Sequence, residues 1–134
     1  MLPSPSPPEF FLDRSLGRHT VADILRTAGW TLHTHHEVFG LRDETIEDVE
    51  WLEHAGRNGL VVLTKDRRLR YRPAEIAAIR RFRVRAFALT RGQLTATEQA
   101  KRFLANADRI RELAHEPAPF LYAVHTGRLE RMYP

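Results

Sequence analysis

The fold of this chain is decided by residues 59–72, which read GLVVLTKDRRLRYR. Residues 60–63 are two leucines and two valines, preceded by Gly59 and followed by polar residues. A short, continuous apolar run of this kind predicts a strand buried on both faces, as in a parallel sheet covered by helices. Open α/β sheets bind ligands beyond the carboxyl ends of their strands, so Asp66 lies where a functional group is expected. The alternative is that Asp66 only caps the turn or helix that follows.

Length and composition set the frame for the rest of the chain. The 134 residues predict one domain with its own core, and the absence of cysteine excludes disulfides and thiolate metal sites. Residues 1–8 hold four prolines and two serines, so residues 1–9 are expected to be a disordered leader and residues 10–134 a single domain. No apolar run is long enough to span a membrane, and we expect a cytoplasmic protein without a membrane partner.

Apolar patterning predicts strands and helices in alternation. Strands are expected at residues 10–12, 30–38, 60–63, 84–89 and 120–124, with a last strand or hairpin arm at 128–133. Helices are expected at residues 18–28, 47–57, 74–81 and 95–114, and a loop at 39–45. This order predicts a three-layer α/β/α domain with a mainly parallel central sheet of about four or five strands. The runs at residues 10 and 60 are the most continuously apolar, which places both near the middle of the sheet.

Three aspartates stand out as candidate functional residues. Asp13 follows the first expected strand, and Asp66 follows the strand at residues 60–63. Asp48 precedes Trp51 by three positions and Leu52 by four in the expected helix, so it shares their inward face. A carboxylate at a buried edge is destabilising unless its charge is compensated, for example by a metal ion. The alternative for Asp48 is a hydrated aspartate that the helix dipole favours.

Together the three acids predict metal-dependent hydrolysis of a phosphodiester. The carboxyl ends of neighbouring parallel strands meet in one crevice, where three carboxylates would repel one another unless a divalent cation bound them. Oxygen ligands select Mg²⁺ or Mn²⁺, and such ions activate water and hold the leaving oxygen. By contrast, His33, His35 and His36 are not expected to bind metal, because alternation in a strand puts His35 and His36 on opposite faces.

The basic residues are concentrated after the central strand. The chain has a net charge of +4, with 19 arginines and 2 lysines, and residues 65–85 hold nine basic residues and two acids. This density is typical of contact with a nucleic-acid backbone, and the planar guanidinium suits phosphate. An arginine-rich genome or a solvated helix face would produce the same composition. The candidates for RNA contact are Arg14, Arg67, Arg68, Arg70, Arg72 and Arg91.

At these residues the sequence resembles the PIN-domain nucleases, especially the compact PIN-like branch that contains VapC-type toxins. The resemblance covers residues 10–90 and is carried by FLDRSLG (11–17), DVEWL (48–52) and VVLTKDRR (61–68). It implies that Asp13, Asp48 and Asp66 are the catalytic and metal-binding acids. Ser15 matches a small polar residue that supports the first aspartate, and Thr64 and Lys65 are expected to support the site with it.

The resemblance also implies an activity and partners. We expect a Mg²⁺- or Mn²⁺-dependent endoribonuclease, the toxin of a toxin–antitoxin pair, with RNA as substrate, a cognate antitoxin protein and a homodimeric state. PIN domains commonly carry a further acid after the next strand, whereas this chain has Thr90 and Arg91 there; Glu44 or Glu98 would have to substitute. The alternatives are a catalytically degenerate PIN-like domain that only binds RNA, and a receiver domain phosphorylated on aspartate.

Overall fold

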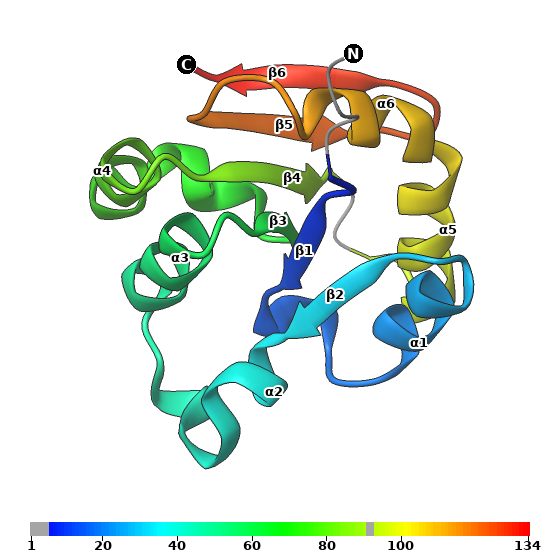
Figure 1. The fold of residues 1–134 in the computed structure, drawn as a ribbon, viewed down its shortest axis with the longest axis horizontal. Helices are drawn as coiled ribbons and strands as arrows, with labels where there is room; N and C mark the ends of the chain where they lie inside the picture. Colours follow the sequence, from blue (N-terminus) through cyan, green and yellow to red (C-terminus); the bar gives the residue numbers. More distant parts are fainter. Residues whose placement is uncertain (1–5, 91–92) are drawn as a thin grey trace.

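The computed structural model describes residues 6–90 and 93–134, and these residues form one six-stranded sheet (Figure 1). The strands are β1 (Glu9–Leu12), β2 (Thr31–Thr34), β3 (Val61–Thr64), β4 (Arg85–Leu89), β5 (Phe120–Val124) and β6 (Leu129–Tyr133). Their order across the sheet is β2-β1-β3-β4-β5-β6. Strands β1 to β5 pair in parallel and β6 is antiparallel to β5. The sheet is mainly parallel as predicted, but it has six strands rather than four or five.

Helices cover both faces of the sheet, which makes the three predicted layers (Figure 1). One layer contains α1 (Thr20–Thr27), α5 (Ala96–Ala105) and α6 (Ala107–Leu113), and the other contains α2 (His35–Phe39), α3 (Asp48–Arg57) and α4 (Pro73–Arg81). In β1, Phe10 and Leu12 pack into the first layer and Phe11 into the second, because alternate residues of a strand point to opposite faces. Strands β1 and β3 are therefore inner strands buried on both sides, as the sequence predicted.

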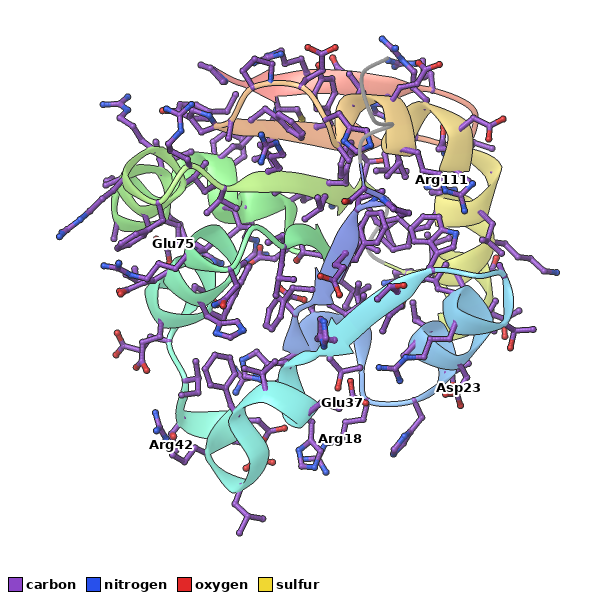
Figure 2. All side chains as sticks on the ribbon, viewed as in Figure 1. Arg18, Asp23, Glu37, Arg42, Glu75 and Arg111 are labelled. Atoms are coloured by element: carbon purple, nitrogen blue, oxygen red, sulfur yellow. The ribbon has the colours of Figure 1, made fainter. Side chains whose placement is uncertain are left out.

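The predicted strand at residues 30–38 is wrong in its second half. Strand β2 ends at Thr34, and α2 begins at His35 with a capping box. The Thr34 hydroxyl accepts a hydrogen bond from the Glu37 backbone N–H at 3.1 Å, and the Glu37 carboxylate accepts one from the Thr34 N–H at 2.8 Å (Glu37 is labelled in Figure 2). This reciprocal pair satisfies backbone donors that a continuing strand would need elsewhere. The expected loop at 39–45 is also ordered, as a 3₁₀ helix, η2 (Gly40–Thr45).

The predicted helix at residues 95–114 is divided in two. Helix α5 ends and α6 begins at Asn106, whose side-chain amide donates to the Arg102 carbonyl at 2.9 Å and to the His125 carbonyl at 3.1 Å. The second acceptor lies in the loop after β5, so a contact far along the sequence interrupts the helix. Both helices still pack on the same face of the sheet as α1, through Phe103 of α5 and Ile110 of α6.

The described part of the chain begins just before the first strand. The expected leader lies outside the described residues for positions 1–5, and its last residue, Glu9, already belongs to β1 and pairs with Thr31. None of the helices in residues 6–90 and 93–134 has the length and apolar character needed to cross a membrane.

Candidate active site

The three predicted aspartates line one pocket at the carboxyl ends of β1 and β3. Asp13 directly follows β1 and caps the 3₁₀ helix η1 (Arg14–Leu16), and Asp66 follows β3 and caps the 3₁₀ helix η3 (Arg67–Tyr71). Asp48 is the first residue of α3. The pocket, which we call the acid pocket, has a volume of about 300 Å³. Its lining residues are Asp13, Arg14, Ser15, His35, Asp48, Trp51, Asp66 and Arg72.

Asp13 is the most enclosed of the three acids. Its side chain is 4 % exposed and accepts hydrogen bonds from the Ser15 backbone N–H at 3.0 Å, from the Ser15 hydroxyl and from the Thr64 hydroxyl at 2.7 Å. Burial raises the pKa of Asp13 to about 6, although these hydrogen bonds oppose the shift, and the nearby charge of Asp48 adds to it. A charged Asp13 is therefore poorly solvated by the protein alone, and a cation at the pocket would stabilise it.

Ser15 and Thr64 connect the ends of β1 and β3. The Asp13 backbone N–H donates to the Leu63 carbonyl at 3.2 Å, which continues the parallel pairing to the strand ends. The Ser15 hydroxyl accepts from the Lys65 backbone N–H at 3.1 Å, and the Thr64 hydroxyl accepts from the Asp66 N–H at 2.9 Å. Ser15 and Thr64 thus hold Asp13 and Asp66 in a fixed relation. Lys65, predicted as a supporting residue, contributes its backbone amide to this network.

Asp48 combines the two alternatives that the sequence left open, an acid that faces the pocket and a hydrated aspartate at a helix start. It stands in the first turn of α3 and its side chain is about a third exposed, as a dipole-favoured aspartate would be. It also faces the pocket, where its Oδ1 accepts from the Trp51 indole N–H at 2.9 Å. Trp51 is buried on the inward face of α3, as expected, and its hydrogen bond holds the Asp48 carboxylate in place.

Arg72 neutralises two of the three acids. Its Nη1 donates to Asp66 Oδ2 at 2.8 Å and to Asp48 Oδ2 at 3.2 Å. Partial burial works against the arginine charge, but the hydrogen bond and charge of Asp66, together with Asp48, raise the pKa of Arg72 above its usual value. Arg72 was predicted to contact RNA, and in this structure its guanidinium lies between the acids instead.

The acid pocket contains the right kind of ligand for Mg²⁺ or Mn²⁺. Its three carboxylates offer oxygen donors, which is what these ions prefer. Within residues 6–90 and 93–134, no three side chains of His, Cys, Asp or Glu are grouped closely enough to hold one ion together. A single positive nitrogen already lies within 3.2 Å of oxygens from Asp48 and Asp66. The carboxylate oxygens are thus the kind of donor that suits a divalent ion, and coordination of one ion by all three acids stays a prediction.

His35 lines the acid pocket, a place that its expected position in a strand did not predict. It is 2 % exposed, and its Nδ1 is buried without a hydrogen-bond partner among the described residues. Burial, followed by the positive charge of Arg14, lowers the pKa of His35, so the ring is neutral near pH 7. The sequence did contain a signal: Thr34 and Glu37 have the spacing of a capping box. That spacing predicts a helix that begins at His35. The argument that His35 and His36 point to opposite faces of a strand therefore does not apply.

The remaining predicted residues are found outside the pocket or at its rim. Arg14 is exposed at the rim and donates to the Asp43 carbonyl at 2.8 Å. Arg67, Arg68 and Arg70 are exposed on η3, and Arg91 lies outside the described residues.

The two candidates for a fourth acid do not line the acid pocket in the described part of the chain. Glu44 is exposed in η2. Glu98 Oε1 accepts from the Thr95 backbone N–H at 3.0 Å, in the capping box of α5. These positions leave Asp13, Asp48 and Asp66 as the acids of the pocket.

Two comparisons with known proteins found similar sequences. Residues 8–91 match the sequence family described as "PIN like domain". Over 123 residues the chain is 31 % identical to a protein of Mycobacterium tuberculosis (strain ATCC 25618 / H37Rv) named "Putative ribonuclease VapC45", and the alignment covers 91 % of this chain and 89 % of the relative. No solved structure matches the chain. The matched residues include β1, α3 and β3, which carry the three aspartates, and the chain therefore belongs to the PIN-like domain family.

Proposed function

We propose that this protein is a metal-dependent endoribonuclease that hydrolyses RNA phosphodiester bonds and acts as the toxin of a toxin–antitoxin pair. The observation that carries the proposal is the acid pocket, in which β1, α3 and β3 each contribute one aspartate beside an arginine-rich surface. The name of the relative, a ribonuclease of VapC type, supports the same activity. We further propose that residues 10–134 act as one domain, because their strands share one sheet.

The residues of the acid pocket would have separate roles in hydrolysis. A bound Mg²⁺ or Mn²⁺ would supply charge that polarises the phosphodiester and lowers the pKa of water. Ser15 and Thr64 keep the Asp13 carboxylate fixed, and Trp51 does the same for Asp48, so little reorganisation is needed. Arg72 lines the pocket and, once released from the acids, would bind a phosphate there through the paired hydrogen bonds that a guanidinium makes.

A second candidate function is RNA binding without cleavage. It is favoured by the pairing of Arg72 with Asp48 and Asp66, and by the lack, within the described residues, of a three-ligand group for a metal ion. In that case the arginine would permanently replace the cation. The two candidates differ in one measurable property, because only the nuclease requires a divalent ion to bind in the acid pocket.

The experiment combines metal binding with cleavage. Wild type and the variants Asp13→Asn, Asp48→Asn and Asp66→Asn are titrated with Mn²⁺ by calorimetry and assayed on single-stranded RNA. We expect one tight event in the wild type, weaker binding in each variant and a loss of cleavage by orders of magnitude. The control is Asp108→Asn, at a fully exposed aspartate of α6. Full cleavage by the three pocket variants would refute the proposed nuclease.

The toxin role concerns the cell and a protein partner. We propose that the protein works in the cytoplasm on RNA, that a cognate antitoxin holds it inactive, and that it forms a homodimer. Induced expression of the wild type should arrest bacterial growth, whereas Asp66→Asn should be tolerated at equal protein level. Light scattering on the purified chain tests the dimer. Harmless expression of an active wild-type enzyme would contradict the toxin role and leave the nuclease proposal intact.

A further inference from the structure

We propose that Tyr71 is a stacking platform for one unpaired base of single-stranded RNA, beside nucleotides whose phosphates the arginines of η3 bind. The inference rests on the proposed ribonuclease function and adds a residue outside the acid pocket that contacts the RNA. It concerns a surface next to the acid pocket, which we call the η3 surface. Its residues are Arg67, Arg68, Arg70, Tyr71 and Arg72, and they line a depression of about 500 Å³.

The short 3₁₀ helix explains how these side chains come to face solvent together. A 3₁₀ helix has three residues per turn, so side chains three positions apart lie on the same side. In η3 this gives two outward sides, one with Arg67 and Arg70 and one with Arg68 and Tyr71. The third side faces the core through Leu69, which is fully buried. Leu69 anchors the segment while the arginines and the tyrosine remain accessible.

Tyr71 is unusual among the aromatic residues of this chain. Its side chain is 67 % exposed, and among the described residues only Leu41 is a large apolar residue of comparable exposure. By contrast, both tryptophans are buried in the two core layers. The guanidinium of Arg70 lies 4.4 Å from the Tyr71 ring centroid, in a cation–π contact. This contact covers one face of the ring and orients it, so a base would stack on the opposite face.

The η3 surface continues the acid pocket. Arg72 lines both depressions, and its guanidinium contacts Asp48 and Asp66 in the acid pocket. An RNA strand with one phosphate at the acids would therefore extend along η3. There the exposed arginines offer charge to the next phosphates, and a base can lie on the tyrosine ring.

The chemistry favours single-stranded RNA over a duplex or an acidic protein. Residues 67–72 contain four arginines and no acid, which fits a polyanion. An aromatic ring stacks on any base whose face is free, and the bases of a duplex are already stacked on one another. An acidic peptide would use the arginines but would leave the tyrosine without a planar partner. A single exposed tyrosine among four arginines is therefore best explained by unpaired nucleotides.

The test pairs a protein change with a nucleic-acid change. Full-length protein is kept metal-free with EDTA, and binding to a fluorescein-labelled single-stranded RNA of about 12 nucleotides is measured by anisotropy. An abasic nucleotide is moved along the strand. We expect wild type to lose about 5- to 100-fold in affinity when the abasic site falls on the Tyr71 position. Tyr71→Ala should bind intact RNA equally weakly and should no longer respond to the abasic site. Such non-additivity identifies a direct contact.

The controls separate stacking from charge and from folding. Tyr71→Phe keeps the ring and should bind within about twofold of the wild type, because the hydroxyl plays no part in stacking. Leu41→Ala removes a fully exposed apolar side chain elsewhere and should leave RNA affinity unchanged. A melting temperature equal to that of the wild type confirms that Tyr71→Ala is folded. The same RNA annealed to its complement should bind with equal affinity to wild type and Tyr71→Ala.

The outcomes distinguish this inference from the proposed function. Unchanged affinity of Tyr71→Ala for single-stranded RNA overturns the stacking platform, and so does a wild type that fails to bind it. In those cases the exposed ring is left for a protein partner. Cleavage by wild type and Asp13→Asn is measured in parallel with Mn²⁺. If Asp13→Asn cleaves undiminished, the nuclease proposal falls whatever the role of Tyr71.

Discussion

The free energy of unfolding of the metal-free Asp13→Asn variant, minus that of the wild type, should increase as the pH rises from acidic to neutral. Burial raises the pKa of Asp13 from 3.8 to about 6. Because the folded-state value lies above the unfolded one, the protonated carboxyl favours folding. This contribution is fully present below about pH 4 and is lost as the pH rises through about 6. Asparagine does not titrate, so the variant lacks this dependence.

The magnitude follows from the two pKa values. The difference between 3.8 and about 6, at 1.36 kcal/mol per pH unit, amounts to about 3 kcal/mol lost by the wild type above pH 6. No large reduction for solvent screening applies, since the side chain is 4 % exposed. In the variant, an amide nitrogen replaces the carboxylate oxygen that accepts the hydrogen bond of the Thr64 hydroxyl, and this nitrogen cannot accept it. The loss of that hydrogen bond lowers the variant's stability by about 1 kcal/mol at every pH. The pH-dependent part of the difference is therefore the quantity to measure.

The assay is urea unfolding followed by tryptophan fluorescence. Wild type and Asp13→Asn are unfolded in EDTA at several pH values from about 4 to 7, and the free energies of unfolding are subtracted. The difference should move in favour of the variant by about 3 kcal/mol across this range. Saturating Mn²⁺ should reverse it, because an ion that binds the charged carboxylate stabilises the wild type. Parallel pH dependences of the two proteins would refute the reasoning, and the exposed Asp108→Asn serves as the control.

Three further predictions concern the charges around the acid pocket. Arg72→Gln should raise the affinity for Mn²⁺ by about tenfold in calorimetry, because it removes a competing cation. It should also lower metal-free stability by about 1 kcal/mol. Weaker Mn²⁺ binding would contradict this prediction. His35→Leu should leave metal-free stability unchanged or raise it by about 1 kcal/mol in urea unfolding, because it removes an unpaired buried nitrogen; a loss of about 2 kcal/mol or more would show that the ring has a structural partner. The double variant Arg67→Gln/Arg68→Gln should reduce the slope of log affinity for RNA against log salt concentration by about one per arginine. The control Arg109→Gln, on α6, should leave the slope unchanged. An unchanged slope in the double variant would exclude phosphate contacts by these two arginines of η3.

Local sequence patterns were sufficient for the elements that carry the acids. The apolar runs before Asp13 and Asp66 predicted β1 and β3, and their continuity placed both inside the sheet. The spacing of Asp48 from Trp51 predicted that the two residues share the inward face of α3, where the structure joins their side chains by a hydrogen bond of 2.9 Å. These predictions succeed because a strand end or one face of a helix is defined by residues a few positions apart.

Where sequence reasoning went wrong, a competing local or distant contact explains the error. The capping box of Thr34 and Glu37 overrides the strand pattern at residues 35–38 and moves His35 into the wall of the acid pocket. That error was avoidable, because the capping signal is local. The break at Asn106 was not, because its amide bonds to the His125 carbonyl, 19 positions away.

The sequence by itself determined which side chains follow the strands and therefore which acids can meet. Only the tertiary structure decided how their charges are balanced. The burial that raises the pKa of Asp13 and the approach of Arg72 to Asp48 and Asp66 depend on packing between β1, α3 and η3. Arg72 is 24 positions from Asp48, and no periodicity relates them. Electrostatic energies vary with distance and solvent exposure, which are properties of the folded chain and not of the order of its residues.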